Sequence, residues 1–238
     1  MAAALAGEDR YVPAPSVVVF DVNETLSDLS GLRQRFVDVG APAHLTQFWF
    51  ASLLRDGFAL TSVGEAVPFA EVGRESLRAA MYGLALTTDV EAAVSHVMTG
   101  FAELSLHADV ATGVRELRGS GLRLVTLSNG AAAVAERLLS AAGIRDEFEQ
   151  VLSVESAGIW KPASGAYYYA AQACEVDLAE MVMVAVHPWD LHGASRAGMR
   201  TAWINRNRSP YPSYFAGPDL TVSVVGDLVR VSALQDPN

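Results

Sequence analysis

Short apolar runs alternate with longer amphipathic segments along most of the chain. The first run, residues 16–20, reads Ser-Val-Val-Val-Phe and carries no charge, which is typical of a strand buried on both faces of a parallel sheet. Similar runs follow at residues 122–127, 148–153, 181–186 and 200–204, and helical patterns cover residues 110–119, 131–142, 163–174 and the stretch around 193–197. This alternation predicts an α/β fold with a doubly wound parallel sheet.

Residues 29–100 interrupt the alternation, because no second buried strand can be recognised there. Apolar side chains recur instead at helix-like spacing, namely Phe36, Phe48, Trp49, Leu53, Leu54 and Phe58. We therefore expect an inserted helical cap domain over residues 29–100, whose core the aromatic side chains mainly form. The α/β core domain would then comprise residues 1–28 and 101–238, with the first twelve or so residues as a loose leader.

Composition narrows the class of partner. The chain has 238 residues, of which 51% are hydrophobic, and this is enough for one α/β core and a smaller inserted domain. The net charge of -10 argues against nucleic acid as a partner, since an acidic protein does not attract a phosphate backbone. A small anionic substrate stays compatible, because local donors can outweigh the overall field.

The cysteine content, the first residues and the length of the apolar runs indicate the cellular compartment of the protein. The single cysteine, Cys174, allows no internal disulfide and fits a reducing compartment. The first ten residues include two acids and no long apolar core, so they do not have the pattern of a secretory signal. No apolar run approaches the ~20 residues that a membrane-spanning helix needs. We expect a cytoplasmic, soluble protein with no membrane partner.

Polar side chains follow several of the predicted strands, at the edge where parallel α/β sheets bind ligands. Asp21 ends the first strand, where a poorly solvated carboxylate suits a nucleophile and Thr25 could donate a hydrogen bond to it. Ser128 and Asn129 end another strand just before a helix, whose N–H groups can hold an anion. The alternative for each of these residues is an ordinary turn or helix cap.

Two more strand ends carry Lys161, directly before Pro162, and Asp190. Lys161 could place a positive charge over the crevice, although a lone lysine is usually a surface residue. Asp190 could orient Lys161 or a hydrolytic water, or it could cap the following helix. Each signal is weak singly, but the four follow one another at successive strand ends. Together they favour an active site in which Asp21 is the nucleophile.

These residues fall into recognisable motifs, which are Phe20-Asp21-x-x-x-Thr25-Leu26, Leu127-Ser128-Asn129-Gly130, Lys161-Pro162 and Trp189-Asp190-x-x-Gly193-Ala194. In them the chain resembles the haloacid dehalogenase superfamily. Residues 202–206, Ala-Trp-Ile-Asn-Arg, look like its type II 2-haloacid dehalogenase branch. The resemblance covers nearly the whole chain and implies a Rossmann-like core, a helical cap and a hydrolase.

The resemblance also implies a role for each matching residue. Asp21 would attack the substrate carbon and form an ester, while Lys161 neutralises the aspartate and the developing charge. Ser128 and Asn129 would hold the substrate carboxylate or the aspartyl oxygens. Asp190 would position Lys161 and the water that hydrolyses the ester.

The resemblance further implies a small carboxylate substrate, which Tyr167 and Trp189 would help to bind, and no cofactor. Phosphatases of the superfamily carry a general acid two residues after the nucleophile, where this chain has Asn23, and more acids for magnesium than Asp190. We therefore expect no metal. Relatives are often dimers, so a homodimer is compatible with the resemblance. The other histidines show no metal-ligand spacing, and we interpret them as surface or cap residues: His44, His96, His107 and His192.

Three positions depart from the 2-haloacid dehalogenase pattern. Asn23 stands where a tyrosine is typical, and Phe50 where a cap arginine receives the halide, so we expect Arg55 to substitute for that arginine. His187 replaces an asparagine and could supply a proton to an amine leaving group. Ring opening of a cyclic amine acid such as azetidine-2-carboxylate is therefore an alternative to dehalogenation. A small-molecule phosphatase and a catalytically silent binding protein are the further alternatives.

Overall fold

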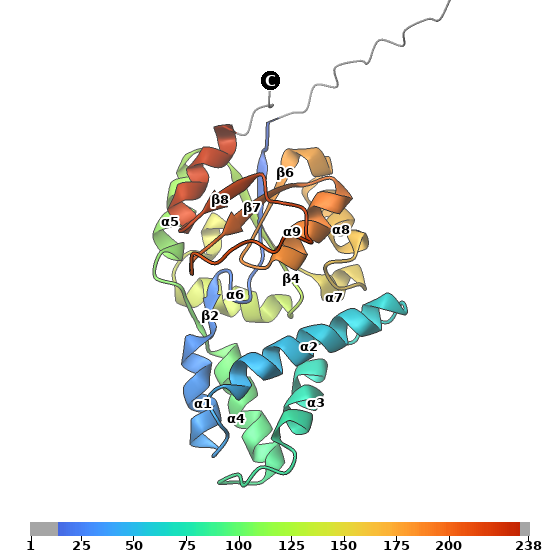
Figure 1. The fold of residues 1–238 in the computed structure, drawn as a ribbon. Coiled ribbons are helices and arrows are strands. Elements are labelled where there is room, and N and C mark those ends of the chain that lie inside the picture. Colours follow the sequence, from blue (N-terminus) through green and yellow to red (C-terminus); the bar gives the residue numbers. More distant parts are fainter. Residues whose placement is uncertain (1–13, 234–238) are drawn as a thin grey trace, which may run out of the picture.

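A parallel β-sheet forms the centre of the computed structural model, which describes residues 14–233 (Figure 1). Within these residues the sheet has six strands in the order β5-β4-β1-β6-β7-β8, and each neighbouring pair is parallel. The strands are β1 (Val17–Phe20), β4 (Arg123–Ser128), β5 (Gln150–Ser153), β6 (Met181–Ala185), β7 (Arg200–Ile204) and β8 (Leu220–Val222). The predicted α/β fold with a doubly wound parallel sheet is confirmed.

Strand β1 is buried on both faces because its successive side chains point to opposite sides of the sheet. Val17 and Val19 belong to one hydrophobic cluster, and Val18 and Phe20 belong to the other. Helices α8 (Ser164–Cys174) and α9 (Pro188–Ala197) contribute to the first cluster, while α5 (Val110–Gly119), α6 (Ala132–Ala141) and the 3-10 helix η4 (Val225–Ala233) contribute to the second. The uninterrupted valine run therefore reflects a strand between two helical layers.

The cap consists of helices α1 (Leu32–Asp38), α2 (Leu45–Ser62), α3 (Phe69–Met81) and α4 (Val90–Ala102). They lie together at the edge of the sheet toward which β1 runs (Figure 1). Trp49 is fully buried among them and donates a hydrogen bond of 2.9 Å from Nε1 to the Gly73 carbonyl oxygen. Phe48, by contrast, is 57% exposed, so the expectation that it belongs to the cap core is wrong. None of the described helices is long and apolar enough to cross a membrane.

Two short antiparallel strands, β2 (Ser27–Asp28) and β3 (Ser105–Leu106), connect the core to the cap. The chain passes through β2 on its way into the cap and through β3 on its way back. Helix α4 continues to Ala102, two residues beyond the predicted end of the cap. The division into a core of residues 1–28 and 101–238 and a cap of residues 29–100 stays a prediction.

Several element ends differ from the sequence prediction. Strand β5 begins at Gln150, because η2 (Arg145–Glu147) precedes it and Phe148 packs edge-on against Phe20 with 6.0 Å between ring centroids. Strand β8 and helix η4 were not predicted. The remaining short helices are η1 (Leu29–Gly31), α7 (Val154–Ala157) and η3 (Leu178–Glu180). The predicted loose leader lies outside the described residues.

Candidate active site

Asp21 lies directly after β1, at the carboxyl edge of the sheet, and is only 3% exposed. Its backbone N–H donates to the Val184 carbonyl oxygen at 3.0 Å, which continues the pairing of β1 with β6. Thr25 Oγ1 donates to Asp21 Oδ2 at 2.7 Å and accepts a hydrogen bond of 3.1 Å from the Val186 N–H. Thr25 therefore holds both the carboxylate and the loop that follows β6.

Lys161 is the only lysine of the sequence and lies fully buried between two carboxylates. Its Nζ donates to Asp21 Oδ1 at 3.0 Å and to Asp190 Oδ2 at 2.6 Å. Burial alone would lower the pKa of Lys161, but the charges of Asp190 and Asp21 outweigh it and raise the pKa above its ordinary value. Lys161 is therefore an ammonium ion at neutral pH. Every other residue of the Lys/Arg type is arginine, and this signal in the sequence also singles out Lys161.

Asp190 is fully buried, and both of its carboxylate oxygens have partners. Tyr167, also fully buried, donates from its hydroxyl to Asp190 Oδ1 at 2.7 Å and approaches the Asp190 carbonyl oxygen at 2.9 Å. Burial and the charge of Asp21 raise the pKa of Asp190, against the opposing effect of Lys161 and the hydroxyl. Tyr167 thus lies behind Asp190 rather than facing a substrate.

Gly193 allows this packing, because it lies one turn after Asp190 on α9. A Cβ at position 193 would come within 2.6 Å of Pro162 Cβ and 2.7 Å of both the Pro162 carbonyl oxygen and the Tyr167 hydroxyl. The peptide bond between Lys161 and Pro162 is cis. The glycine of the last motif is therefore required by close packing around the buried charges.

Asn129 has a different position from the one expected. Its Oδ1 accepts from the Lys161 backbone N–H at 2.9 Å, and its Nδ2 donates to the Lys161 carbonyl oxygen at 3.2 Å. The side-chain amide thus pairs with both backbone groups of Lys161 and fixes the loop that carries the ammonium. The expectation that this amide holds a substrate carboxylate has no support from the geometry, because the amide already has these partners.

Ser128 ends β4 and lies at a cavity between core and cap. Its Oγ accepts a hydrogen bond of 2.9 Å from the Gly130 N–H. This smaller cavity has a volume of about 240 Å³ and is also lined by Asn23, Arg74 and Phe69. Ser128 and Asn23 are thus brought to one wall, and helix α3 of the cap supplies the opposite wall.

His187, Phe50 and Trp189 form a stack across the boundary between cap and core. The His187 ring lies 6.4 Å from Phe50 of α2 and 5.1 Å from Trp189 of α9, with interplanar angles of 28° and 21°. His187 Nε2 lies 3.8 Å from Asp21 Oδ2. The structure therefore brings the unusual histidine and the unusual phenylalanine together beside the carboxylate.

Arg55 does not join this group. Its side chain is 69% exposed and pairs with Asp56, at 2.7 Å between Nε and Oδ1. Helical spacing explains the difference, because Phe50, Leu53 and Leu54 are buried or half-buried and Arg55 is on the opposite side of α2. The expectation that Arg55 replaces the missing arginine is not supported by this position.

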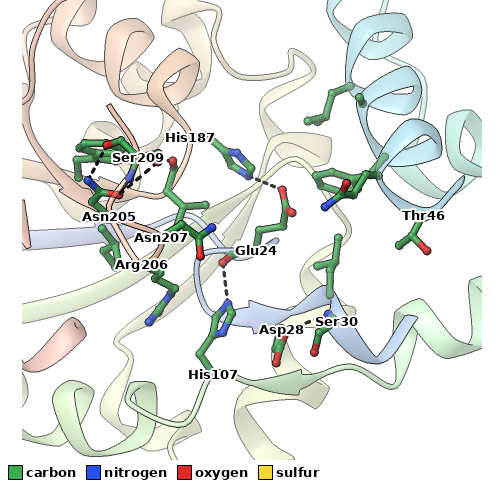
Figure 2. A pocket seen from close by; sticks show the side chains of 18 of the residues that line it. Glu24, Asp28, Ser30, Thr46, His107, His187, Asn205, Arg206, Asn207 and Ser209 are labelled. Atoms are coloured by element: carbon green, nitrogen blue, oxygen red, sulfur yellow. Dashed lines mark hydrogen bonds and ion pairs between the residues drawn. The ribbon is translucent and has the colours of Figure 1, made fainter. Parts of the chain in front are cut away.

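His187 also lines a larger cavity of about 630 Å³ (Figure 2). Glu24, His107 and Arg206 are among its lining residues. His107 Nε2 contacts the Glu24 carbonyl oxygen at 2.9 Å, so this histidine is not the surface or cap residue that we expected. Arg206 donates to the Thr25 carbonyl oxygen at 3.0 Å. Both side chains hold the loop that carries Asp21.

Glu24 is a further residue beside Asp21 that the sequence motifs do not predict. It is a non-glycine residue in the left-handed region, with a φ of 62°, which side chains disfavour. Burial raises its pKa, against the charge of His187, while Asp21 adds to the increase. No signal in one sequence marks such a backbone conformation.

The described residues offer no candidate site for a metal ion. Among residues 14–233, no group of three or more His, Cys, Asp or Glu side chains is arranged to hold a metal ion. The absence of a metal requirement stays a prediction.

Comparisons with known proteins agree with this fold. The L-2-haloacid dehalogenase from Xanthobacter autotrophicus aligns with a TM-score of 0.84 and 25% sequence identity, covering 93% of this chain and 100% of that one. A structure of the same enzyme with chloropropionic acid covalently bound gives a TM-score of 0.82 at 25% identity, with the same shares covered, 93% and 100%. An (S)-2-haloacid dehalogenase from Pseudomonas sp. strain YL is 28% identical over 216 residues, which are 90% of this chain and 93% of the relative.

An α/β core with a helical cap and a buried aspartate–lysine pair at the carboxyl edge of the sheet defines a class of hydrolase. Residues 15–198 match the family model of haloacid dehalogenase-like hydrolases. The chain belongs to this family, and the resemblance to its 2-haloacid dehalogenase branch is confirmed. The prediction that the protein is a hydrolase is confirmed as well.

Proposed function

We propose that this protein hydrolyses a small 2-substituted carboxylic acid, with 2-halo acids as the first candidates, through an ester formed on Asp21. The observation that carries the proposal is the setting of Asp21. Its carboxylate is buried at a strand end, 3.0 Å from the Lys161 ammonium and 2.7 Å from the Thr25 hydroxyl. A nucleophile held in place and poorly solvated is suited to displacement at carbon.

In the first step, an Asp21 oxygen attacks the carbon that bears the leaving group, and the bond to that group breaks with its electron pair. Lys161 keeps the carboxylate oriented and balances the charge of Asp190. Asn129 and Tyr167 act on this step indirectly, because they fix the backbone of Lys161 and the carboxylate of Asp190. The cap excludes bulk water while the ester forms.

The smaller cavity supplies a place for the substrate. Ser128 retains a hydroxyl hydrogen that can be donated to a carboxylate, because its contact with Gly130 uses the oxygen as acceptor. Arg74 of α3 lines the same cavity and offers a positive charge to the substrate carboxylate. A volume of about 240 Å³, with Phe69 in the wall, suits a short acid with a small alkyl group.

In the second step, water attacks the carboxyl carbon of Asp21 and releases the hydroxy acid. The covalently bound chloropropionic acid in the Xanthobacter autotrophicus dehalogenase supports a covalent intermediate in this fold. The larger cavity of about 630 Å³ provides room for water next to His187.

Single turnover in heavy-oxygen water tests the ester directly. With enzyme in excess over 2-chloropropionate, we expect heavy oxygen in the peptide that contains Asp21 and ordinary oxygen in the lactate. Asp21→Asn, which keeps the shape and removes the charge, should release no halide. Turnover with labelled lactate and unlabelled Asp21 would contradict the ester mechanism, because water would then attack the substrate itself.

A second candidate is hydrolysis of a carbon–nitrogen bond, and one observation favours it. The residue that faces Asp21 beside Phe50 is a histidine at 3.8 Å, which can protonate an amine. Incubation with 2-halo acids, fluoroacetate and azetidine-2-carboxylate, with readouts for halide and for ring opening, separates the two leaving groups. Asp21→Asn is again the control.

The phosphatase and the silent binding protein have their own tests. A phosphatase would release phosphate from an aryl phosphate in a magnesium-dependent manner. A binding protein would show no mass increase on the Asp21 peptide after incubation with any substrate of the panel. Either result would replace the proposed function.

A further inference from the structure

One ring nitrogen of His187 is surrounded by oxygen atoms that can only accept hydrogen bonds. Nε2 lies 3.2 Å from the Asn23 carbonyl oxygen, 3.6 Å from Glu24 Oε2 and 3.8 Å from Asp21 Oδ2. A lone pair on Nε2 would be repelled by these oxygens, whereas an N–H is attracted by them. The surroundings therefore favour a hydrogen on Nε2, with the Asn23 carbonyl oxygen as its nearest acceptor and Glu24 and Asp21 slightly farther away.

The imidazole ring is fixed in this orientation. Phe50 stacks on it from the cap and Trp189 from the core, and its side chain is only 12% exposed. The two stacks fix the plane of the ring, and the three acceptor oxygens favour the orientation in which Nε2 lies among them. His187 thus presents a donor beside Asp21, at the boundary between cap and core.

The Glu24 side chain lies beside His187 although the backbone of Glu24 has a left-handed conformation. The φ of 62° is one that glycine adopts freely and that a side chain disfavours. His107 holds the Glu24 carbonyl oxygen at 2.9 Å, so the turn is fixed from the side of the core. Figure 2 shows the Glu24 carboxylate pointing to His187 while its carbonyl oxygen points to His107. A glutamate at a position where glycine would be less strained indicates a function for its carboxylate.

We propose that Glu24 is a positioning residue for His187, and that the pair supplies a hydrogen bond or a proton to the atom that Asp21 displaces. This inference rests on the proposed function and deepens it, because it assigns the group that receives the leaving atom. The Glu24 carboxylate oxygen, 3.6 Å from Nε2, attracts the N–H of the ring and so favours the orientation in which Nε2 faces this side. The pair then takes the place of a cap guanidinium as the donor to the leaving group.

The chemical steps balance for both kinds of leaving group. When a halide leaves, the C–X bond breaks with its electron pair, and the N–H of His187 hydrogen-bonds the ion without transfer. When a nitrogen that enters unprotonated leaves, the Nε2 proton moves to it and a neutral imidazole remains. Hydrolysis of the Asp21 ester then releases one proton from water, and that proton restores the imidazolium.

The charged groups around the pair are compatible with this role. Burial raises the pKa of Glu24, so that it can exchange protons closer to neutral pH than a free glutamate. Its carboxyl group lines the larger cavity and so meets solvent. The titratable and charged groups that face the pair or line the same cavity are Asp21, Asp28, Arg33, His107 and Arg206.

A leaving-group series tests the proposal. Halide release is measured in single turnovers of 2-fluoro-, 2-chloro-, 2-bromo- and 2-iodopropionate, because fluoride depends most on a hydrogen-bond donor and iodide least. For Glu24→Gln we expect the fluoride rate to fall about 10- to 100-fold and the iodide rate to stay within about 2-fold. The matched control is Asp28→Asn, which also removes a carboxylate from the lining of the larger cavity. The Asp28 carboxylate accepts a hydrogen bond of 2.8 Å from the Ser30 N–H and is not paired with His187.

The dependence on the leaving group distinguishes donation from a structural effect, because a structural effect would lower the rates for all four halides alike. Glu24→Gly, whose backbone favours the observed φ, should fold and show the same selective loss for fluoride.

The contrary outcomes are distinct. An equal loss for all four halides, or the same selective loss in Asp28→Asn, would overturn the role of Glu24 while leaving the ester mechanism intact. No ester on Asp21 of the wild-type protein with any substrate would overturn the proposed function, and this inference with it.

Discussion

Replacement of Tyr167 by phenylalanine is the sharpest test of the buried charge cluster. The change removes one hydroxyl and keeps the ring. That hydroxyl donates to Asp190 Oδ1 at 2.7 Å, inside a region where both side chains are fully buried. Without it, one oxygen of a buried carboxylate loses its donor, and no solvent reaches the site to replace it.

The expected cost follows from this loss. Hydrogen bonds to charged groups contribute about 1.5–3 kcal/mol, and a buried acceptor left without a partner loses an amount of this order. Because the ring stays, no cavity cost of the size seen in Phe→Ala changes is added. We therefore expect Tyr167→Phe to lower the free energy of unfolding by about 2–3 kcal/mol, which corresponds to about 4–12 °C in Tm for a chain of this size.

Urea denaturation followed by circular dichroism measures the change. Tyr168→Phe is the matched control, because Tyr168 follows directly on the same helix and is 56% exposed. The control should stay within about 0.5 kcal/mol of the wild type. Equal stability of the two variants would refute the reasoning, since the hydroxyl of Tyr167 would then contribute no more than an exposed one.

Three further changes have expected outcomes. Burial lowers the pKa of Lys161, but its carboxylate partners raise this pKa more. The ion pairs of Lys161 should therefore stabilise the protein fully below pH 10.5, the ordinary pKa of lysine, and this stabilisation should be lost as the pH rises beyond it. Urea denaturation between pH 8 and 12 measures the loss, which should be absent in Lys161→Met. Gly193→Ala should destabilise the protein by more than about 2 kcal/mol, because the new Cβ would lie 2.6 Å from Pro162 Cβ. The control Gly119→Ala should be neutral or stabilising by up to about 1 kcal/mol, because a Cβ there would meet nothing within 4 Å among the described residues. Thermal denaturation compares the two variants, and equal effects would contradict the packing argument. Glu24→Gly should raise the free energy of unfolding by up to about 1 kcal/mol as backbone strain is relieved, and a clear loss in urea denaturation would mean that the side chain stabilises the fold.

The order of strands and helices was readable from the sequence because each strand is a short apolar run. β1, β4, β6 and β7 are buried on nearly every position, so their periodicity and composition mark them without knowledge of the fold. Strand β8 escaped prediction because it is a three-residue edge strand with little apolar pattern. The cytoplasmic location and the homodimer stay predictions.

The sequence by itself determined which residues could carry chemistry, since Asp21, Lys161 and Asp190 follow strands that end at one edge of a parallel sheet. Only the tertiary structure decided what each side chain contacts. Asn129 turns to the Lys161 backbone and Arg55 points away, because these directions depend on loop conformation and helix rotation. Glu24 meets His187 only when the loops after β1 and β6 fold together across 163 residues of chain, a pairing that no local pattern encodes.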